Sequence, residues 1–311
     1  MLQTLRSHCR IALFAGLMIL CIQSGSWALT IEADDQFAYA EALFKNRQYF
    51  EAAQEYQRFT FFFPDDPKYP QAVFQTGVSF LLAQNPARAL DFFKILSTAD
   101  PLDALAVASF FKMAECYQLM NAPTHAIVQL NNLIELSDDP VIRDRAYYQI
   151  AWIHIELTDW AGARKAVDQI TPTGRQRYGW AELSKALSSA EDIPTKSPAL
   201  AGTLSIIPGG GQLYCRRYED ALIAFVVNAG LVWAAFDAFD NEQYGLGGLL
   251  SFVGLGFYAG NIYGAVNDAH KFNDRQQRGF VDQLRQYRVY ETGPPGDAAR
   301  KGITISLKIS F

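Results

Sequence analysis

Four segments in the first half of the chain share one arrangement of small and large apolar residues. In each, a small residue is followed three positions later by a large one, nine further on by alanine, and four beyond that by another large residue. The segments are Ala40/Leu43/Ala52/Tyr56, Gly77/Phe80/Ala89/Phe93, Ala114/Tyr117/Ala126/Leu130 and Ala151/His154/Ala163/Val167. The alanines recur every 37 residues, and this regular interval predicts a repeated structural unit.

The pattern within each unit predicts two antiparallel helices. The small residue on the first helix and the alanine on the second let the two backbones approach, and the large residues fill the remaining space. Pro64, Pro101 and Pro140 fall in the links between units, where proline stops a helix from continuing. A single hairpin cannot bury its apolar face alone, so we expect the units to stack into a solenoid.

These units resemble the tetratricopeptide repeat over residues 35–172. Residues 49–52 and 61–64 look like the start and end of the family's second helix, and the 37-residue interval is similar to periplasmic repeat proteins of the BamD and YbgF (CpoB) kind. The resemblance implies a groove, lined by the first helices, that binds a protein or peptide. Its positions in this chain are Phe37, Glu41, Phe44, Phe74, Val78, Leu81, Phe111, Glu115, Tyr148 and Trp152.

An aromatic groove with acidic points suits an extended or helical peptide that carries apolar anchors. The alternative is that these aromatic side chains pack against neighbouring repeats or against the rest of the chain.

Two long uncharged stretches follow in the second half. Residues 221–236 and 243–267 contain no Lys, Arg, Asp or Glu. As helices they measure about 24 and 37 Å, against a bilayer core of about 30 Å, and the first spans it if Asp237 lies at the interface. We therefore expect a transmembrane helical hairpin. A buried hairpin of a soluble protein is the alternative, but the high glycine content argues against it.

Small and polar residues punctuate these stretches. Gly256, Gly260 and Gly264 recur every four residues, a spacing that lets two membrane helices touch backbone to backbone. Asn228 and Asn261 lie inside the apolar runs, where an unpaired amide is costly. We expect them to bond across a helix interface; a polar or ion-conducting site is the alternative.

A glycine-rich element precedes the hairpin. The run Pro208-Gly209-Gly210-Gly211-Gln212-Leu213-Tyr214 is no phosphate loop, because no Gly-Lys-Ser/Thr follows it. With residues 214–218 it resembles the Pro-Gly-x-Gly-Gln-x-Tyr element of small bacterial membrane modules (TM2 and DUF5683 domains), over residues 200–270. The resemblance implies a membrane location rather than an activity. The expected membrane-interface residues are Gly209, Gly210, Gly211, Gln212, Tyr214, Arg216 and Arg217, with the two arginines binding lipid phosphates.

The two ends of the chain carry further signals. Residues 1–28 predict an export signal, with Arg6 and Arg10 before an apolar run at 11–22 and cleavage after Ala28; an uncleaved anchor is the alternative. Residues 267–290 predict an amphipathic helix. Residues 303–311 alternate apolar and polar side chains, which predicts a short strand that pairs with a partner's sheet edge or with another copy.

The basic residues create a conflict over topology. With an export signal and a two-span hairpin, five basic residues on the flanks of the hairpin face the outside, against the positive-inside tendency: Arg216, Arg217, Lys271, Arg275 and Arg278. A third crossing by residues 198–207 would reverse this, but ten residues reach only about 15 Å. We therefore expect two spans.

The sequence has few residue patterns that indicate catalysis, metal binding or nucleic-acid binding. The net charge is −5, which provides no electrostatic footprint for nucleic acid. The histidines have no metal-ligand spacing, and no catalytic constellation is visible. Cys116 and Cys215 are the cysteines outside the signal, and we expect Cys116 to be a buried, unreactive thiol. We expect no enzymatic activity, no cofactor and no metal.

Together these patterns predict an all-α protein: a tetratricopeptide-like solenoid, then a transmembrane helical hairpin, with a short C-terminal β-strand. The expected segments are 1–28 (signal), 29–172 (repeats), 173–198 (linker with a capping helix near 180–187), 199–270 (membrane module) and 271–311 (tail). The expected function is a non-enzymatic envelope scaffold, with periplasmic repeats that bind a protein or peptide and an anchor in the lipid of a membrane, the inner one by preference. The alternative is an oligomeric membrane assembly, or a small pore, nucleated by the glycine-rich hairpin.

Overall fold

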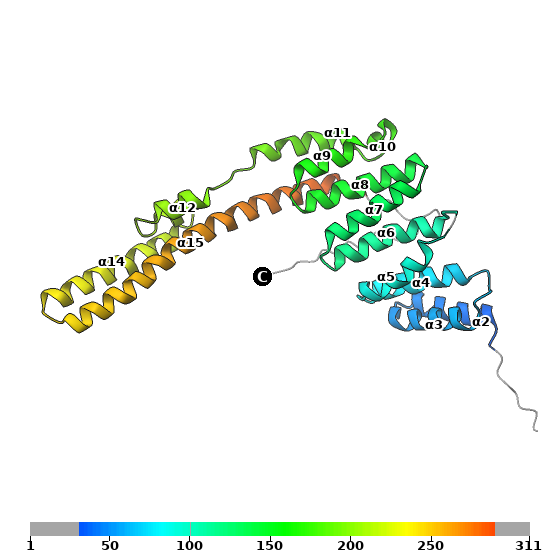
Figure 1. The fold of residues 1–311 in the computed structure, drawn as a ribbon, viewed down its shortest axis with the longest axis horizontal. Helices are drawn as coiled ribbons and strands as arrows, with labels where there is room; N and C mark the ends of the chain where they lie inside the picture. Colours follow the sequence, from blue (N-terminus) through cyan, green and yellow to red (C-terminus); the bar gives the residue numbers. More distant parts are fainter. Residues whose placement is uncertain (1–30, 100, 290–311) are drawn as a thin grey trace, which may run out of the picture. The chain divides into compact units, whose positions relative to one another are not determined.

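The computed structural model describes residues 31–99 and 101–289, and these residues form helices and their connections without any strand (Figure 1). The expected signal at 1–28 and the expected strand at 303–311 lie outside the described residues. The chain divides after Ala122 into two compact units, and each is described by itself.

The first unit is a succession of helices joined by short turns. Its elements are α2 (Ala33–Lys45), α3 (Tyr49–Phe62), α4 (Tyr69–Leu82), α5 (Pro86–Leu96) and α6 (Ala104–Leu119). Each helix packs against the next along the chain, and α4 also packs against α6. The repeated helical hairpins expected from the 37-residue interval are therefore present.

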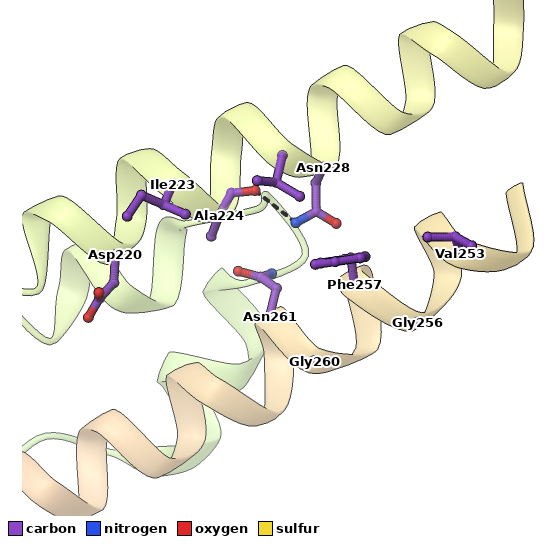
Figure 2. A pocket seen from close by; sticks show the side chains of 10 residues that line it. Asp220, Ile223, Ala224, Asn228, Val253, Gly256, Phe257, Gly260 and Asn261 are labelled. Carbon is purple, nitrogen blue, oxygen red and sulfur yellow. Dashed lines mark hydrogen bonds between the residues drawn. The ribbon is translucent and has the colours of Figure 1, made fainter. Parts of the chain in front are cut away.

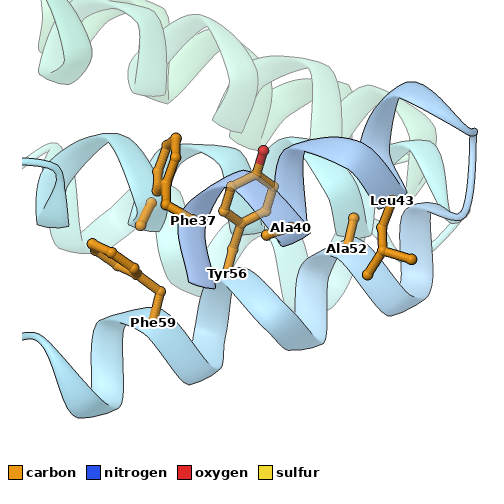
Figure 3. Close-up of a cluster of buried hydrophobic side chains, with 7 residues drawn as sticks. Phe37, Ala40, Leu43, Ala52, Tyr56 and Phe59 are labelled. Carbon is orange, nitrogen blue, oxygen red and sulfur yellow. The ribbon is translucent and has the colours of Figure 1, made fainter. Parts of the chain in front are cut away.

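The space between α2 and α3 shows how the small and large positions fit together. Phe37 from α2 meets the rings of Tyr56 and Phe59 edge-on, with centroids 5.4 Å apart in both pairs, beside Ala40 and Ala52 (Figure 3). The next hairpin repeats the arrangement in a tighter form. A Cβ atom on Gly77 would lie 2.7 Å from the ring of Phe93, so the small residue makes room for the large one.

The same positions are buried in all four segments. The four repeat alanines have no exposed surface, and the small residues of the first helices are buried with them. The last large position is buried as well, by residues of four different kinds: Tyr56, Phe93, Leu130 and Val167. The spacing in the sequence thus marks the inner face of each helix.

The turns within the hairpins follow the same interval. Arg47, Gln84, Asn121 and Thr158 each have φ between +56° and +63°, the left-handed region that non-glycine residues rarely adopt. In each turn the left-handed residue donates its N–H to the carbonyl three residues back, and the next residue donates to the carbonyl five residues back. This is the Schellman arrangement, which satisfies the last carbonyls of a helix.

The second unit begins with α7 (Pro123–Leu136), α8 (Pro140–Glu156) and α9 (Trp160–Asp168). Three short elements follow: α10 (Pro172–Arg177), α11 (Trp180–Ser188) and the 3₁₀ helix η1 (Ser189–Asp192). The buried carboxylate of Asp144 accepts from the N–H and the hydroxyl of Thr171, at 2.8 and 2.6 Å, which ties the start of α10 to α8. Arg164 on α9 reaches Glu191 and the carbonyl of Leu187, so the α11–η1 segment folds back onto α9.

The remainder of the second unit is built around one long helix. Two short helices, α12 (Pro198–Leu204) and α13 (Gly210–Tyr214), precede α14 (Tyr218–Asp240) and α15 (Tyr244–Leu284), and η2 (Arg285–Tyr287) closes the described chain. All three earlier helices pack against α15. At seven residues, α12 is about 10 Å long, too short to cross a bilayer. The amphipathic segment expected after residue 267 is the continuation of α15 rather than a separate helix.

Helices α14 and α15 are long and apolar enough to cross a membrane. Their most apolar windows have mean hydropathies of 1.9 and 1.4, yet only 17% and 11% of those windows are buried within the chain. Large side chains such as Trp233, Phe236 and Phe252 point outward. A core helix of a soluble protein would bury such side chains, so the exposure of these residues is compatible with α14 and α15 as membrane spans.

The left-handed turn residues yield a prediction on stability. Replacing Thr158 by glycine should raise the free energy of unfolding by about 1 kcal/mol, because a β-branched residue is strained at positive φ and glycine is not. The measurement is the midpoint of thermal loss of helical circular dichroism for the full chain in detergent.

Asn121→Gly is the matched control, because Asn121 occupies the same turn position and asparagine tolerates this conformation. Its effect should be no more than a few tenths of a kcal/mol. Equal shifts for the two variants would contradict the strain argument.

Candidate functional site

Half of the residues expected to line a partner groove are buried within the chain. Phe37 belongs to the core between α2 and α3, and Trp152 is only 1% exposed. Leu81, Phe111 and Tyr148 are likewise buried. These five side chains are therefore not accessible to a partner in this structure.

Tyr148 and Trp152 contact the end of the described chain. The ring of Tyr148 stacks on Tyr178 with a centroid distance of 4.1 Å, and its hydroxyl accepts a hydrogen bond from the N–H of Val289 at 2.7 Å. The guanidinium of Arg288 lies 5.1 Å from the ring centroid of Trp152, within the range of a cation–π contact. The segment after α15 therefore occupies the surface that the repeat pattern had assigned to a partner.

The other five expected groove residues keep exposed surface. Phe44 and Phe74 are partly buried, each edge-on to a ring of its own hairpin, Tyr49 and Phe93 respectively. Val78 is partly exposed. The carboxylates of Glu41 and Glu115 are near half-exposed and pair within their own helices with Lys45 and Lys112. A surface with two carboxylates and partly accessible rings thus remains on the first helices of unit one.

The charged end of α15 docks onto the repeat helices α8 and α9. Arg285 binds Glu156 with two nitrogens, at 3.2 and 2.6 Å, and also pairs with Asp282 at 2.6 Å. Arg288 lies 3.6 Å from the same glutamate. Beside this cluster, the rings of Trp160 and Phe280 meet edge-on at 5.4 Å. The sequence offers no signal for this contact, because the partners are separated by 120 residues or more.

At the other end of the second unit, the glycine-rich element forms a tight turn between α12 and α13. Gly209 has φ +85°, and any side chain there would also collide with the carbonyl of Ala221. Gly211 allows α13 to lie directly against Ala201, Ser205 and Ala265, with no room for a Cβ atom. The glycines therefore permit two short helices to seat on α15.

Asn261 is the centre of this arrangement. Its side-chain oxygen accepts from the N–H of Gly209 at 3.0 Å, and its amide nitrogen donates to the carbonyl of Ser205 at 2.9 Å. Its own carbonyl accepts from Gln212 at 2.9 Å. All four residues are buried. Asn228 differs: its amide donates to Ala224 of its own helix at 2.7 Å.

The remaining interface residues lie at the base of the hairpin. Tyr214 accepts from the N–H of Ser197 at 3.1 Å, and Lys196 lies 4.3 Å from the centre of its ring. Arg217 pairs with Asp220, and this hydrogen-bonded ion pair raises the pKa of the guanidinium. Arg216 is exposed and takes the left-handed conformation in the turn between α13 and α14. Among the described residues, this turn therefore carries one exposed arginine, Arg216, that makes no ion pair and one, Arg217, that pairs with Asp220.

The glycine series on α15 does not pack as its spacing predicts. A Cβ atom on Gly256 or Gly260 would find no other atom within 4 Å, and one on Gly264 would meet only Gln212 at 3.7 Å. Helix α14 therefore does not exploit these glycines for close backbone contact. The expectation that they hold the hairpin together is corrected: a larger side chain at Gly260 fits without disturbing α14.

Metal and thiol chemistry have no visible site in the described part of the chain. Its residues contain no group of three His, Cys, Asp or Glu side chains positioned for a metal ion. Cys116 and Cys215 are free and buried. Burial raises the pKa of the Cys116 thiol to about 12, so this sulfur stays protonated and weakly nucleophilic near neutral pH.

Comparison of the chain with family profiles and with curated proteins gives no match. The assignment of a role therefore rests on the repeat packing, the apolar hairpin and the contacts described above.

Reversing one charge at the junction should loosen the end of α15. Arg285→Glu places a third acid beside Glu156 and Asp282, and we expect amide hydrogen exchange at residues 281–289 to accelerate about fivefold, the equivalent of about 1 kcal/mol. Adding Glu156→Arg should restore part of the protection, because the pair re-forms with exchanged signs.

Arg278→Glu is the control for this experiment, since Arg278 is exposed and contacts only Asp274, at 3.9 Å, one turn away. A similar acceleration in this control would mean that helix charge, rather than docking on α8, sets the exchange rate.

Removing the amide of Asn261 should release the glycine-rich element. Asn261→Leu leaves the N–H of Gly209 and the carbonyl of Ser205 buried without partners, at a cost of about 2 to 5 kcal/mol. We expect faster proteolysis within residues 198–215 in mild detergent. Asn241→Leu, which removes a bond at the exposed end of α14, should leave the cleavage rate unchanged.

Proposed function

We propose that this chain is a non-enzymatic scaffold of the bacterial cell envelope. A tetratricopeptide-like repeat domain binds a protein or peptide partner, and an apolar helical hairpin holds that domain at a membrane. The proposal is supported by the buried repeat positions at 37-residue intervals and by two helices whose apolar side chains face outward. The observed helical hairpins are compatible with tetratricopeptide-like repeats, and the proposal adds the likeness to that family and the role as a scaffold.

The continuity of α15 is the observation that carries this proposal. Residues 244–267 of the helix are uncharged, whereas its last 17 residues carry both acids and bases. The uncharged part suits a bilayer core, and the charged end binds Glu156 on α8. A single helix therefore joins the membrane module to the repeats without a flexible linker, as a tethered scaffold requires.

The exposed groove positions suggest the kind of partner. Glu41 and Glu115 offer carboxylates on the first helices, and Phe44 and Phe74 offer partly accessible rings. A segment that carries basic side chains and an apolar anchor would match them. We propose such a segment as the ligand, bound away from the Tyr148 surface that the chain itself covers.

The proposed location is the periplasmic side of the inner membrane, because residues 1–28 have the pattern of an export signal. The charge distribution opposes this placement: basic residues lie at the base of the hairpin, whereas the opposite end carries Asp237, Asp240 and Glu242. Protease treatment of intact spheroplasts separates the two topologies, since it digests the repeats only if they are periplasmic.

An oligomeric membrane assembly, including a small pore, is the second candidate. The open glycine face on α15 favours it, because no other part of residues 31–99 and 101–289 lies within 4 Å of a Cβ placed on Gly256 or Gly260.

Charge reversal on the first helices tests partner binding. The double change Glu41→Lys and Glu115→Lys should lower the recovery of a specifically bound partner at least about tenfold, because each lost charge-assisted contact is worth about 1 kcal/mol or more. The measurement is quantitative mass spectrometry of proteins that copurify with the full chain in mild detergent.

Glu51→Lys is the control, since Glu51 is exposed on α3, a second helix of a repeat. The proposal is abandoned if no protein copurifies reproducibly, or if the control and the double variant lose the same proteins.

A further inference from the structure

An open groove of about 460 Å³ runs between α14 and α15 (Figure 2). Gly256 and Gly260 form part of its wall on α15, and Ile223 and Asn228 line it from α14, with the ring of Phe257 between them (Figure 2). The groove lies in the part of the hairpin whose outer side chains are apolar. Its occupant must therefore be compatible with hydrocarbon.

The two glycines leave space that the chain itself does not use. No atom lies within 4 Å of a Cβ placed on either residue. Gly247 on the same helix is different, because its Cβ would lie 2.8 Å from the ring of Phe239. Contact with Phe239 of α14 thus explains Gly247, and it leaves the two glycines at the groove unexplained.

Asn228 provides an independent sign of a missing partner. It lies at the middle of the uncharged run of α14 and is 5% exposed, with its side chain in the groove (Figure 2). One hydrogen of its amide nitrogen bonds to Ala224. Within the part of the chain that the structure describes, its Oδ1 accepts no hydrogen bond, although an unpaired amide is costly at this depth. The occupant must therefore supply a hydrogen-bond donor.

We infer that a second copy of this chain occupies the groove and forms a two-fold symmetric pair. This inference rests on the membrane placement proposed above. In that placement both copies have the same orientation, so the same residue of each copy lies at the same depth in the bilayer. Asn228 then faces Asn228 of the other copy, and the second amide hydrogen of each donates to the free oxygen of the other. A lipid acyl chain fills the same volume but offers no donor.

A two-fold interface requires a surface that is complementary to itself. Phe257 is 53% exposed and stands one turn from Gly260 on the same helix. Across a two-fold axis, the ring of each copy meets the glycine surface of the other. Glycine at this position allows the close approach on which membrane helices depend for their attraction.

The test is the monomer–dimer equilibrium of the full chain in lipid vesicles. Copies with a C-terminal fluorescent label are counted by single-molecule photobleaching over a series of protein-to-lipid ratios. We expect the wild type to pair, and Asn228→Leu to raise the dissociation constant roughly 3- to 30-fold, the range for one interhelical amide contact. Gly260→Leu should raise it about tenfold or more by filling the groove.

Gly230→Leu is the matched control. Gly230 is exposed on α14, lies outside the groove and, like Gly260, has no atom within 4 Å of a Cβ. It should not change the equilibrium. A wild type that stays monomeric at every ratio overturns the inference, as does equal behaviour of the Gly260 and Gly230 variants.

Three further outcomes are distinguishable. A monomer that retains a phospholipid in native mass spectrometry, and loses it in Gly260→Leu, assigns the groove to lipid and overturns the pairing. If alkaline extraction removes the wild-type chain from membranes, the proposed tethering fails as well. A chain that resists extraction but stays monomeric refutes the pairing alone.

Discussion

The structure depends on α15, a single helix whose first part carries no charged side chains and whose last 17 residues carry both acids and bases. A helix satisfies its backbone hydrogen bonds internally, which is the condition for crossing hydrocarbon, and only its side chains need to change along its length. From Tyr244 the exposed residues are apolar, whereas from Asp268 onward charged residues alternate with apolar ones. The apolar half is packed by α12, α13 and α14, and the charged half docks on α8 and α9 through Glu156 and Trp160. Each half thus fixes the orientation of the other.

Buried hydrogen bonds to irregular backbone secure the short helices to this rod. The turn before α13 exposes the N–H of Gly209 and the carbonyl of Ser205, which a regular helix would have paired internally, and Asn261 satisfies both. Asn273, further along α15, makes the same pair of hydrogen bonds. Its side chain accepts from the N–H of Lys196 at 2.7 Å and donates to the carbonyl of Lys196 at 2.9 Å. Non-helical backbone is tolerated near a membrane only when such partners exist, and two asparagines three turns apart provide them here.

Sequence spacing predicted the repeats well because the packing requirement recurs: a buried alanine at the same point of each hairpin tolerates no larger side chain. The left-handed turn residues recur at the same interval but are of four different polar types, so residue identity does not reveal them: Arg47, Gln84, Asn121 and Thr158. Of the two interpretations of the groove residues, the structure supports packing for the five that are buried. Tyr148 and Trp152 are covered by residues more than 130 positions later, and no local pattern encodes that contact. The prediction that the glycine series of α15 packs against α14 was wrong, because a Cβ atom on Gly256 or Gly260 would meet no atom of α14 within 4 Å.

The unbroken helix between Asn261 and Arg285, the residue that follows the end of α15 at Leu284, has a consequence for how this chain can vary. Each added residue turns the following helix by 100° and advances it by 1.5 Å. One insertion between these two residues would therefore rotate Phe280 and Arg285 away from α8 and α9 while the membrane end kept its position. In this segment the rotational phase of the helix matters more than the identity of its residues. Insertions and deletions there are therefore restricted to lengths close to whole helical turns.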